Sequence, residues 1–181
     1  GSDLHVNRRM LDKKIEAAAF VVTISMYNKE LMVAECGESV RGKIYVIHCG
    51  VDHDVFSAAA SIAPKNVLNI VCVASFEEVK GHKYLVEACR LLRERGMPFV
   101  CNLVGEGPLR GEVHDQLVRS ALTDHVALRG GLRRLEVVKL LSEADVAVLA
   151  SVPTKNGKRE GIPVVLMEAM ASGLPVVASC I

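Results

Sequence analysis

Short apolar runs and amphipathic segments alternate along almost the whole chain, and this alternation limits the folds open to it. Apolar runs of strand length occupy 66–75, 97–105, 125–130, 145–151 and 175–179, with helix-like segments over 80–96, 108–121, 133–144 and 163–173. Strictly alternating strands and helices form right-handed crossovers, so apolar strands of this kind belong to a parallel sheet. The predicted fold class is α/β, a Rossmann-like parallel sheet with helices on both faces.

The first 50 residues carry a shorter version of the same pattern. Strands are expected over 18–25 and 42–50, with a helix over 26–36 that Ser25 is placed to cap. The stretch 51–66 has no clean period and contains a proline, so it is predicted to be a connection.

Local expectations for two of the later helices can be checked against a structure. Pro108 is expected at the first position of the helix over 108–121, and Gly96 is expected to end the helix over 80–96. The buried face of that helix is expected to consist of Tyr84, Leu85, Ala88, Leu91 and Leu92.

Composition narrows the class of protein. Half of the 181 residues are hydrophobic, yet no apolar run approaches the length that spans a membrane. The formal net charge of +1 argues against a nucleic-acid partner, which would favour a basic face. The six cysteines form no CxxC pair and have no histidine at metal-ligand spacing, so we expect reduced core thiols in a cytoplasmic protein and no metal.

A single carboxylate interrupts the apolar stretch "PVVLMEAMAS", where Glu168 and Ser172 are the polar side chains. This composition predicts a helix that is buried nearly all round. A buried carboxylate without partners costs several kcal/mol, so Glu168 should meet hydroxyls, amides or a cation. The two adjacent hydroxyls of a ribose suit it. The alternative is that Glu168 is the one solvated residue of a half-exposed helix.

The residues before this helix predict an anion site. Gly161, Ile162 and Pro163 lead into the helix, whose first free amides and dipole favour a phosphate. Glu160 precedes them and could bind a hydroxyl further along the same ligand, or it could be a surface charge beside Lys158. The loop 151–162 follows a strand, and open parallel sheets bind ligands at that end. A phosphate site between two carboxylates matches a nucleoside-diphosphate sugar.

These residues resemble a known family. "EGIPVVLMEAMASGLPVVAS" resembles the Glu-x7-Glu signature of the retaining glycosyltransferases of family 4 (glycosyl transferases group 1), which have the GT-B fold. "VKGHKYLVEACRLL" is similar to the family's Lys-Gly helix start, and "LVGEGPLR" to its Gly-acid-Gly-Pro turn. "VIHCGVDHDVF" is similar to the segment that joins the two domains, and "FVVTIS" to the last strand of the acceptor-side domain.

The resemblance covers nearly the whole chain but only the second half of such an enzyme. It implies that residues 1–50 are the end of the acceptor-side domain and the inter-domain connection. Residues 51–181 would be the nucleotide-sugar-binding domain, truncated at its end. The chain stops two residues after a predicted strand whose edge needs covering, which also leads us to expect an excerpt from a longer protein.

The resemblance also implies roles for individual residues. Glu168 would bind the ribose, Glu160 would contact the transferred sugar, and Lys80 would neutralise the departing diphosphate. The backbone of Gly161, Ile162 and Pro163 would hold the distal phosphate.

One position departs from the family pattern. Ser75 stands where the family often has an arginine that shares the diphosphate, and a hydroxyl cannot replace that charge. Either another cation compensates, namely Arg133, Lys158 or Arg159, or the donor binds more weakly.

The implied activity is retaining transfer of a hexose from a UDP- or GDP-linked donor to a saccharide or lipid-linked acceptor, without a further cofactor. The other implied partner is the missing N-terminal domain, and peripheral membrane association of the full enzyme stays open. Within the family, the residues of this motif favour bacterial surface-polysaccharide enzymes. Two alternatives remain: a degenerate transferase domain kept as a nucleotide-binding or assembly module, and a sugar-nucleotide epimerase.

Overall fold

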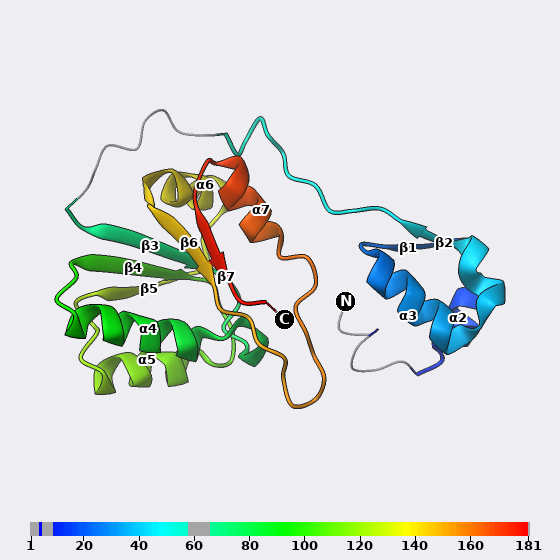
Figure 1. Ribbon diagram of the computed structural model, residues 1–181, viewed down its shortest axis with the longest axis horizontal. Helices are drawn as coiled ribbons and strands as arrows, with labels where there is room; N and C mark the ends of the chain where they lie inside the picture. Colours follow the sequence, from blue (N-terminus) through cyan, green and yellow to red (C-terminus); the bar gives the residue numbers. More distant parts are fainter. Residues whose placement is uncertain (1–3, 5–8, 58–65, 181) are drawn as a thin grey trace.

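The computed structural model describes residue 4 and residues 9–57 and 66–180. These residues form two separate sheets (Figure 1). The smaller sheet pairs β1 (Val21–Thr23) with β2 (Ile44–Val46) in parallel. Residues 58–65, the centre of the predicted connection 51–66, lie outside the described part of the chain.

The larger sheet has five strands, which are β3 (Leu68–Val73), β4 (Phe99–Val104), β5 (Val126–Gly130), β6 (Val146–Leu149) and β7 (Val176–Ala178). Their order is β5-β4-β3-β6-β7, and every neighbouring pair is parallel. The first strand of this sheet, β3, is therefore central. Strands β4 and β5 follow on one side of it, and β6 and β7 on the other. This is the doubly wound Rossmann order, and it confirms the predicted fold class.

Helices cover both faces of the larger sheet (Figure 1). One face carries α4 (His82–Glu94) and α5 (Arg110–Arg119), and the other carries α6 (Arg134–Glu143) and α7 (Val164–Ala171). The strands supply both cores, because successive residues point to opposite faces. Ile70 and Cys72 pack toward α4, while Val71 between them packs toward α6.

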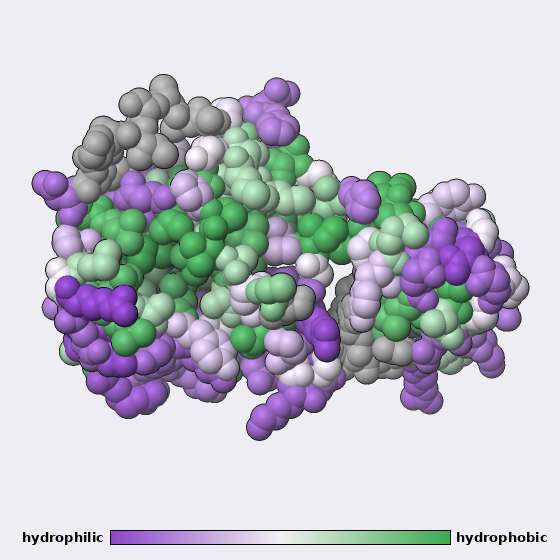
Figure 2. Space-filling view, in the orientation of Figure 1, coloured by the Kyte–Doolittle hydropathy of each residue, from purple (hydrophilic) through white to green (hydrophobic). Residues whose placement is uncertain are grey.

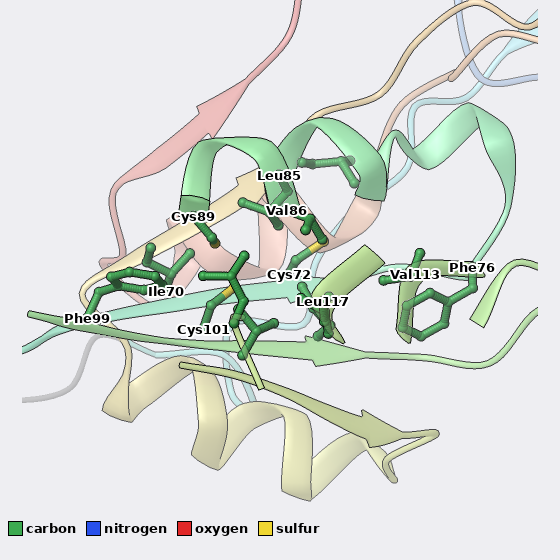
Figure 3. Close-up of a cluster of buried hydrophobic side chains, with 14 residues drawn as sticks. Ile70, Cys72, Phe76, Leu85, Val86, Cys89, Phe99, Cys101, Val113 and Leu117 are labelled. Atoms are coloured by element: carbon green, nitrogen blue, oxygen red, sulfur yellow. The ribbon is translucent and has the colours of Figure 1, made fainter. Parts of the chain in front are cut away.

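The core beneath α4 contains three of the cysteines (Figure 3). Cys72, Cys89 and Cys101 are buried here as free thiols, as expected, whereas Cys36 and Cys49 are partly exposed and Cys180 is exposed. Burial raises the pKa of the Cys72 thiol to about 12, so this side chain stays a neutral, small hydrophobe at physiological pH.

The smaller sheet packs on α3 (Met26–Cys36) and a 3₁₀ segment (Glu38–Lys43), and α2 (Leu11–Ala17) packs against these two elements. Helix α3 has the bounds that the sequence predicts, and Ser25 caps it as expected by accepting a hydrogen bond from the Asn28 amide at 3.2 Å. None of the helices in the described residues is long and apolar enough to cross a membrane.

Strand β7 forms one edge of the larger sheet, next to β6. Its Val177 is 57 % exposed. Figure 2 shows apolar side chains gathered on the surface of the larger body where β7 and its neighbours lie in Figure 1.

Two local expectations about the helices are wrong, one of them only in part. Leu85 is buried and Leu92 packs on the core as expected, whereas Tyr84 is 50 % exposed and Ala88 and Leu91 are exposed. Val86 and Cys89 share the buried side with Leu85 instead. The apolar residues of this segment span more than one face, so their positions alone do not identify the buried one. Pro108 lies outside α5, which begins at Arg110 after Leu109 as its N-cap.

A glycine joins β3's loop to α4 where two backbones nearly touch. Gly81 has φ +64°, and a Cβ there would lie 1.8 Å from the carbonyl oxygen of Ala150. The loop after β3 can therefore approach the end of β6 closely because this residue has no side chain.

We predict that Gly81→Ala lowers the free energy of unfolding by about 3 kcal/mol or more, since backbone clash adds to left-handed strain. Gly96→Ala is the matched control, because Gly96 has φ +67° with nothing within 4 Å of its would-be Cβ. It should cost about 1–2 kcal/mol, the strain alone. Urea denaturation of both variants measures the difference, and equal losses would contradict the close approach.

Candidate functional site

The candidate site lies where the strand order reverses, between β3 and β6. Open parallel sheets bind ligands in the crevice at the carboxyl ends of such strands. The segment after β3 and the loop after β6 meet there, and the Val152 amide donates to the Val79 carbonyl at 2.9 Å. Gly105, after β4, lies against the same segment, since its Cβ would be 2.1 Å from the Ala74 oxygen. Three loops are thus held together at this edge of the sheet.

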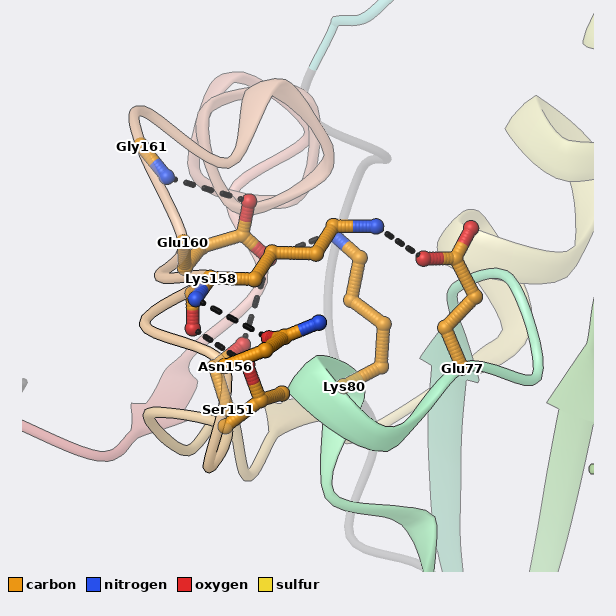
Figure 4. A network of polar contacts seen from close by, with 8 residues as sticks. Glu77, Lys80, Ser151, Asn156, Lys158, Glu160 and Gly161 are labelled. Atoms are coloured by element: carbon orange, nitrogen blue, oxygen red, sulfur yellow. Dashed lines mark hydrogen bonds and ion pairs between the residues drawn. The ribbon is translucent and has the colours of Figure 1, made fainter. Parts of the chain in front are cut away.

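The two residues predicted to be catalytic, Lys80 and Glu160, form an ion pair in this crevice (Figure 4). Ser151 donates to the same carboxylate oxygen at 3.2 Å, and the Gly161 amide donates to the other oxygen at 3.3 Å. The side chains of Lys80 and Glu160 are 21 % and 15 % exposed. A positive charge is therefore held at the crevice, shielded from most of the solvent.

A second ion pair joins the same two loops, with the positions of the cation and the carboxylate exchanged between them. Lys158, from the loop after β6, reaches Glu77, from the segment after β3 (Figure 4). The hydrogen bond from Lys158 lowers the pKa of the Glu77 carboxyl below its usual value, with smaller contributions from the Ser75 hydroxyl and the charge of Lys80. Lys80, Glu77 and Lys158 therefore belong to one charged cluster, and Ser75 borders it.

The sequence reasoning missed Glu77 and Ser151. A usable signal existed, because both residues follow β3 or β6 closely, and the carboxyl ends of neighbouring parallel strands meet. It named Lys158 only as one of three cations that could offset Ser75. Of the other two, Arg133 pairs with Glu136 with its side chain 88 % exposed, and Arg159 is exposed. The structure brings Lys158 alone of these three into the cluster.

The N-terminal end of α7 opens onto a cavity of about 260 Å³. Its walls include Leu149, Ser151, Glu160, Gly161, Pro163 and Leu166. Pro163 is the N-cap of α7, so the predicted anion-binding amides lie beside this cavity and beside the carboxylate of Glu160.

Glu168 lies in the second turn of α7 and is half-buried. Within the described part of the chain, its carboxylate has no hydrogen-bond or ion-pair partner, and Lys80 pairs with Glu160 instead. The expectation that α7 is buried nearly all round is wrong, because Met170 is exposed and Ala169 is its one fully buried residue. The helix packs on β6 and β7 at the end of the sheet, so one side stays uncovered.

His82 begins α4 two residues after Lys80 and anchors this end of the helix. Its ring is 4 % exposed and stacks on Phe76, with centroids 4.4 Å apart. Its Nε2 has no hydrogen-bond partner among the described residues. Burial, and secondarily the charge of Lys80, lower the pKa of His82 from 6.5 to about 4. The histidine is therefore neutral in the folded protein at physiological pH.

Comparisons with known proteins bear on this geometry. Residues 68–181 match the family described as Glycosyl transferases group 1. The chain is similar to the amylovoran biosynthesis glycosyltransferase AmsK of Erwinia amylovora, 39 % identical over 137 residues, covering 76 % of this chain and 34 % of AmsK. It is also similar to the GDP-mannose-dependent alpha-(1-6)-phosphatidylinositol monomannoside mannosyltransferase of Mycobacterium tuberculosis, at 28 % identity, covering 98 % of this chain and 48 % of that protein.

Among solved structures, the fold is similar to that of HepE from Anabaena, solved in complex with UDP and glucose. The TM-score is 0.75 at 21 % identity, covering 95 % of this chain and 47 % of HepE. The chain thus spans about a third to a half of the length of these proteins.

The depressed pKa of His82 determines how the free energy of unfolding should change as the pH is lowered. Between pH 6.5 and 4 the unfolded chain binds a proton at this residue and the folded chain does not, so stability falls as the pH is lowered and levels off below pH 4. This group should contribute about 3 kcal/mol to that loss. We predict that His82→Phe, which keeps a stacked ring, removes this part of the pH dependence in urea titrations at pH 4 to 7. The exposed His114→Phe serves as control and should match the parent chain. Identical pH slopes for His82→Phe and the parent would contradict the prediction.

Proposed function

Because the chain belongs to the glycosyl transferases group 1 family, we propose that it binds the nucleoside diphosphate of a sugar donor in the crevice between β3 and β6. The observation that carries the proposal is the position of Lys80, whose ammonium is held at the crevice beside the N-terminal end of α7. Glu160, the partner of Lys80, lines the cavity at this end of α7. A fixed cation near helix amides is the arrangement that a diphosphate needs.

The reaction we propose is retaining transfer of a hexose, as in the retaining glycosyltransferases of family 4. The bond between the anomeric carbon and the phosphate oxygen breaks, and its electron pair stays on the diphosphate. The acceptor hydroxyl oxygen forms the new bond on the same face of the sugar, and its proton passes to the departing phosphate oxygen. Negative charge develops on the departing phosphate, where Lys80 and the amides of Gly161 and Ile162 stabilise it.

The remaining site residues act on the rest of the donor. We assign the ribose hydroxyls to Glu168, since a half-buried carboxylate that lacks a partner among the described residues is suited to accept two hydrogen bonds from a diol. Glu160 borders the cavity and is assigned to the transferred sugar. Pro163 holds the preceding amides toward the distal phosphate.

The donor and acceptor classes follow the relatives. HepE was solved with UDP and glucose, and the mycobacterial relative is GDP-mannose-dependent, so UDP and GDP are the candidate nucleotides. AmsK acts in amylovoran biosynthesis, which supports a saccharide or lipid-linked acceptor in polysaccharide synthesis. An N-terminal domain that supplies acceptor contacts, a cytoplasmic location and independence of a further cofactor stay predictions.

A second candidate function is a nucleotide-binding or assembly module descended from a transferase. Ser75 favours it, because an arginine lost from the diphosphate site removes charge that catalysis uses. An activity assay distinguishes the two functions. Either protein would bind a nucleoside diphosphate, but only the enzyme would transfer sugar from its donor once the acceptor-side domain is present.

We predict that Glu168→Ala weakens binding of the preferred nucleotide, UDP or GDP, by about 10- to 100-fold, because charged hydrogen bonds to the ribose are lost. The free energy of unfolding should be preserved, since the carboxylate has no partner to lose within the described residues. Calorimetric titration with UDP, GDP and ADP measures the affinities. Glu112→Ala, which removes an exposed carboxylate on α5, is the control and should bind as the parent does.

The outcome that would overturn the proposed function is clear. A folded parent chain that binds none of the three nucleotides lacks the proposed site. Loss of stability in Glu168→Ala without a change in nucleotide affinity would make Glu168 a structural residue instead.

A further inference from the structure

Two ion pairs cross between the same two loops in opposite directions (Figure 4). The segment after β3 provides Lys80 and Glu77, and the loop after β6 provides Glu160 and Lys158. Each loop thus offers one cation and one carboxylate to the other. The cluster is neutral as a whole, with two positive and two negative side chains.

The contacts of Glu160 are those that a bound phosphate would use. Its carboxylate accepts from the Lys80 ammonium, the Ser151 hydroxyl and the Gly161 amide. The proposed function assigns both Lys80 and the Gly161 amide to the donor's diphosphate. A diphosphate that binds these groups therefore competes with the carboxylate of Glu160.

The two anions cannot share Lys80 without cost. A phosphate on the ammonium of Lys80 would stand close to the carboxylate of Glu160, in a crevice where both side chains are largely shielded from water. Like charges repel more strongly in such surroundings than in bulk solvent. Lys158 and Glu77 belong to the same cluster, but their side chains are 34 % and 38 % exposed, so water screens the repulsion between a phosphate and Glu77 more strongly.

We propose that Glu160 and Glu77 are internal counterions that the donor's diphosphate displaces, so that Lys80 and Lys158 exchange a carboxylate for phosphate. This inference rests on the proposed function and deepens it. Lys158 becomes the second phosphate-binding cation, supplied from the loop after β6. Glu160 leaves Lys80 only when a phosphate has replaced it, and its carboxylate is then free to accept hydroxyls of the sugar.

The exchange makes sugar recognition depend on the diphosphate. A free sugar brings no anion to take over Lys80, so Glu160 stays in its ion pair and its contacts to Ser151 and Gly161. A nucleoside-diphosphate sugar brings both the displacing anion and the hydroxyls that satisfy the released carboxylate. The cluster thus selects against sugars that lack the phosphate groups.

The test measures nucleotide affinity without any sugar present. Glu160→Gln and Glu77→Gln each remove a competing anion and keep the side-chain shape, so calorimetry should show UDP and GDP binding roughly three- to tenfold tighter than to the parent. Lys158→Met should weaken the same nucleotides by a similar factor. Uridine and guanosine, which carry no phosphate, should bind all variants as they bind the parent.

A matched control separates displacement from a general charge effect. Glu78→Gln removes an exposed carboxylate from the same turn as Glu77, and within the described residues that side chain has no partner. It should change nucleotide affinity less than twofold. The exchange would be overturned if Glu160→Gln and Glu77→Gln bound UDP and GDP no more tightly than Glu78→Gln does. It would also be overturned if Lys158→Met bound these nucleotides as tightly as the parent does.

The outcomes distinguish this inference from the proposed function itself. A parent chain that binds neither UDP nor GDP removes the proposed function and the exchange with it. A parent chain that binds them, with variants that do not respond as described, removes the exchange alone. Thermal melts of each variant establish that it is folded, and Glu77→Gln provides an independent readout should Glu160→Gln unfold.

Discussion

The reversal of strand order between β3 and β6 is the constraint on which the site depends. It places the carboxyl ends of two parallel strands side by side, although their loops are about 80 residues apart in the chain. The close backbone approach at Gly81 and the hydrogen bond between Val152 and Val79 then hold these two loops against each other. Side chains from one loop can reach carboxylates on the other because the backbones are already fixed. The charged cluster is a consequence of sheet topology rather than of local sequence.

Partial burial gives this cluster its chemical character. Two unit charges about 4 Å apart interact by about 1 kcal/mol in water and about 4 kcal/mol at an effective dielectric constant near 20. A lysine in a crevice such as that of Lys80 therefore needs a counterion, because leaving it unpaired is costly. Glu160 is that counterion in the structure. Any group that takes its place must bring negative charge as well as hydrogen-bond acceptors, which a phosphate does and a neutral sugar does not.

The sequence predicted the larger sheet well because each strand is an apolar run and each helix follows a clear break. It also predicted the cap at Ser25, which depends on neighbouring residues alone. It failed where tertiary packing decides. The residues Tyr84 and Leu85 are both apolar, and only the sheet beneath α4 selects Leu85 for burial. The half-exposure of α7 reflects its place at the end of the sheet. The pairing of Glu77 with Lys158 has no local signal, since it joins residues from different crossovers.

The serine at position 75 takes a different meaning once the contacts are considered together. An arginine there would supply positive charge from the segment after β3, which is held rigidly by the neighbouring loops. This chain instead directs Lys158 to Glu77, in the same segment, from the loop after β6. That loop also carries Glu160, so in the proposed exchange the second cation and the sugar ligand are supplied by the same loop. A phosphate that binds Lys158 therefore acts on the loop that positions Glu160, a connection that an arginine after β3 would not make.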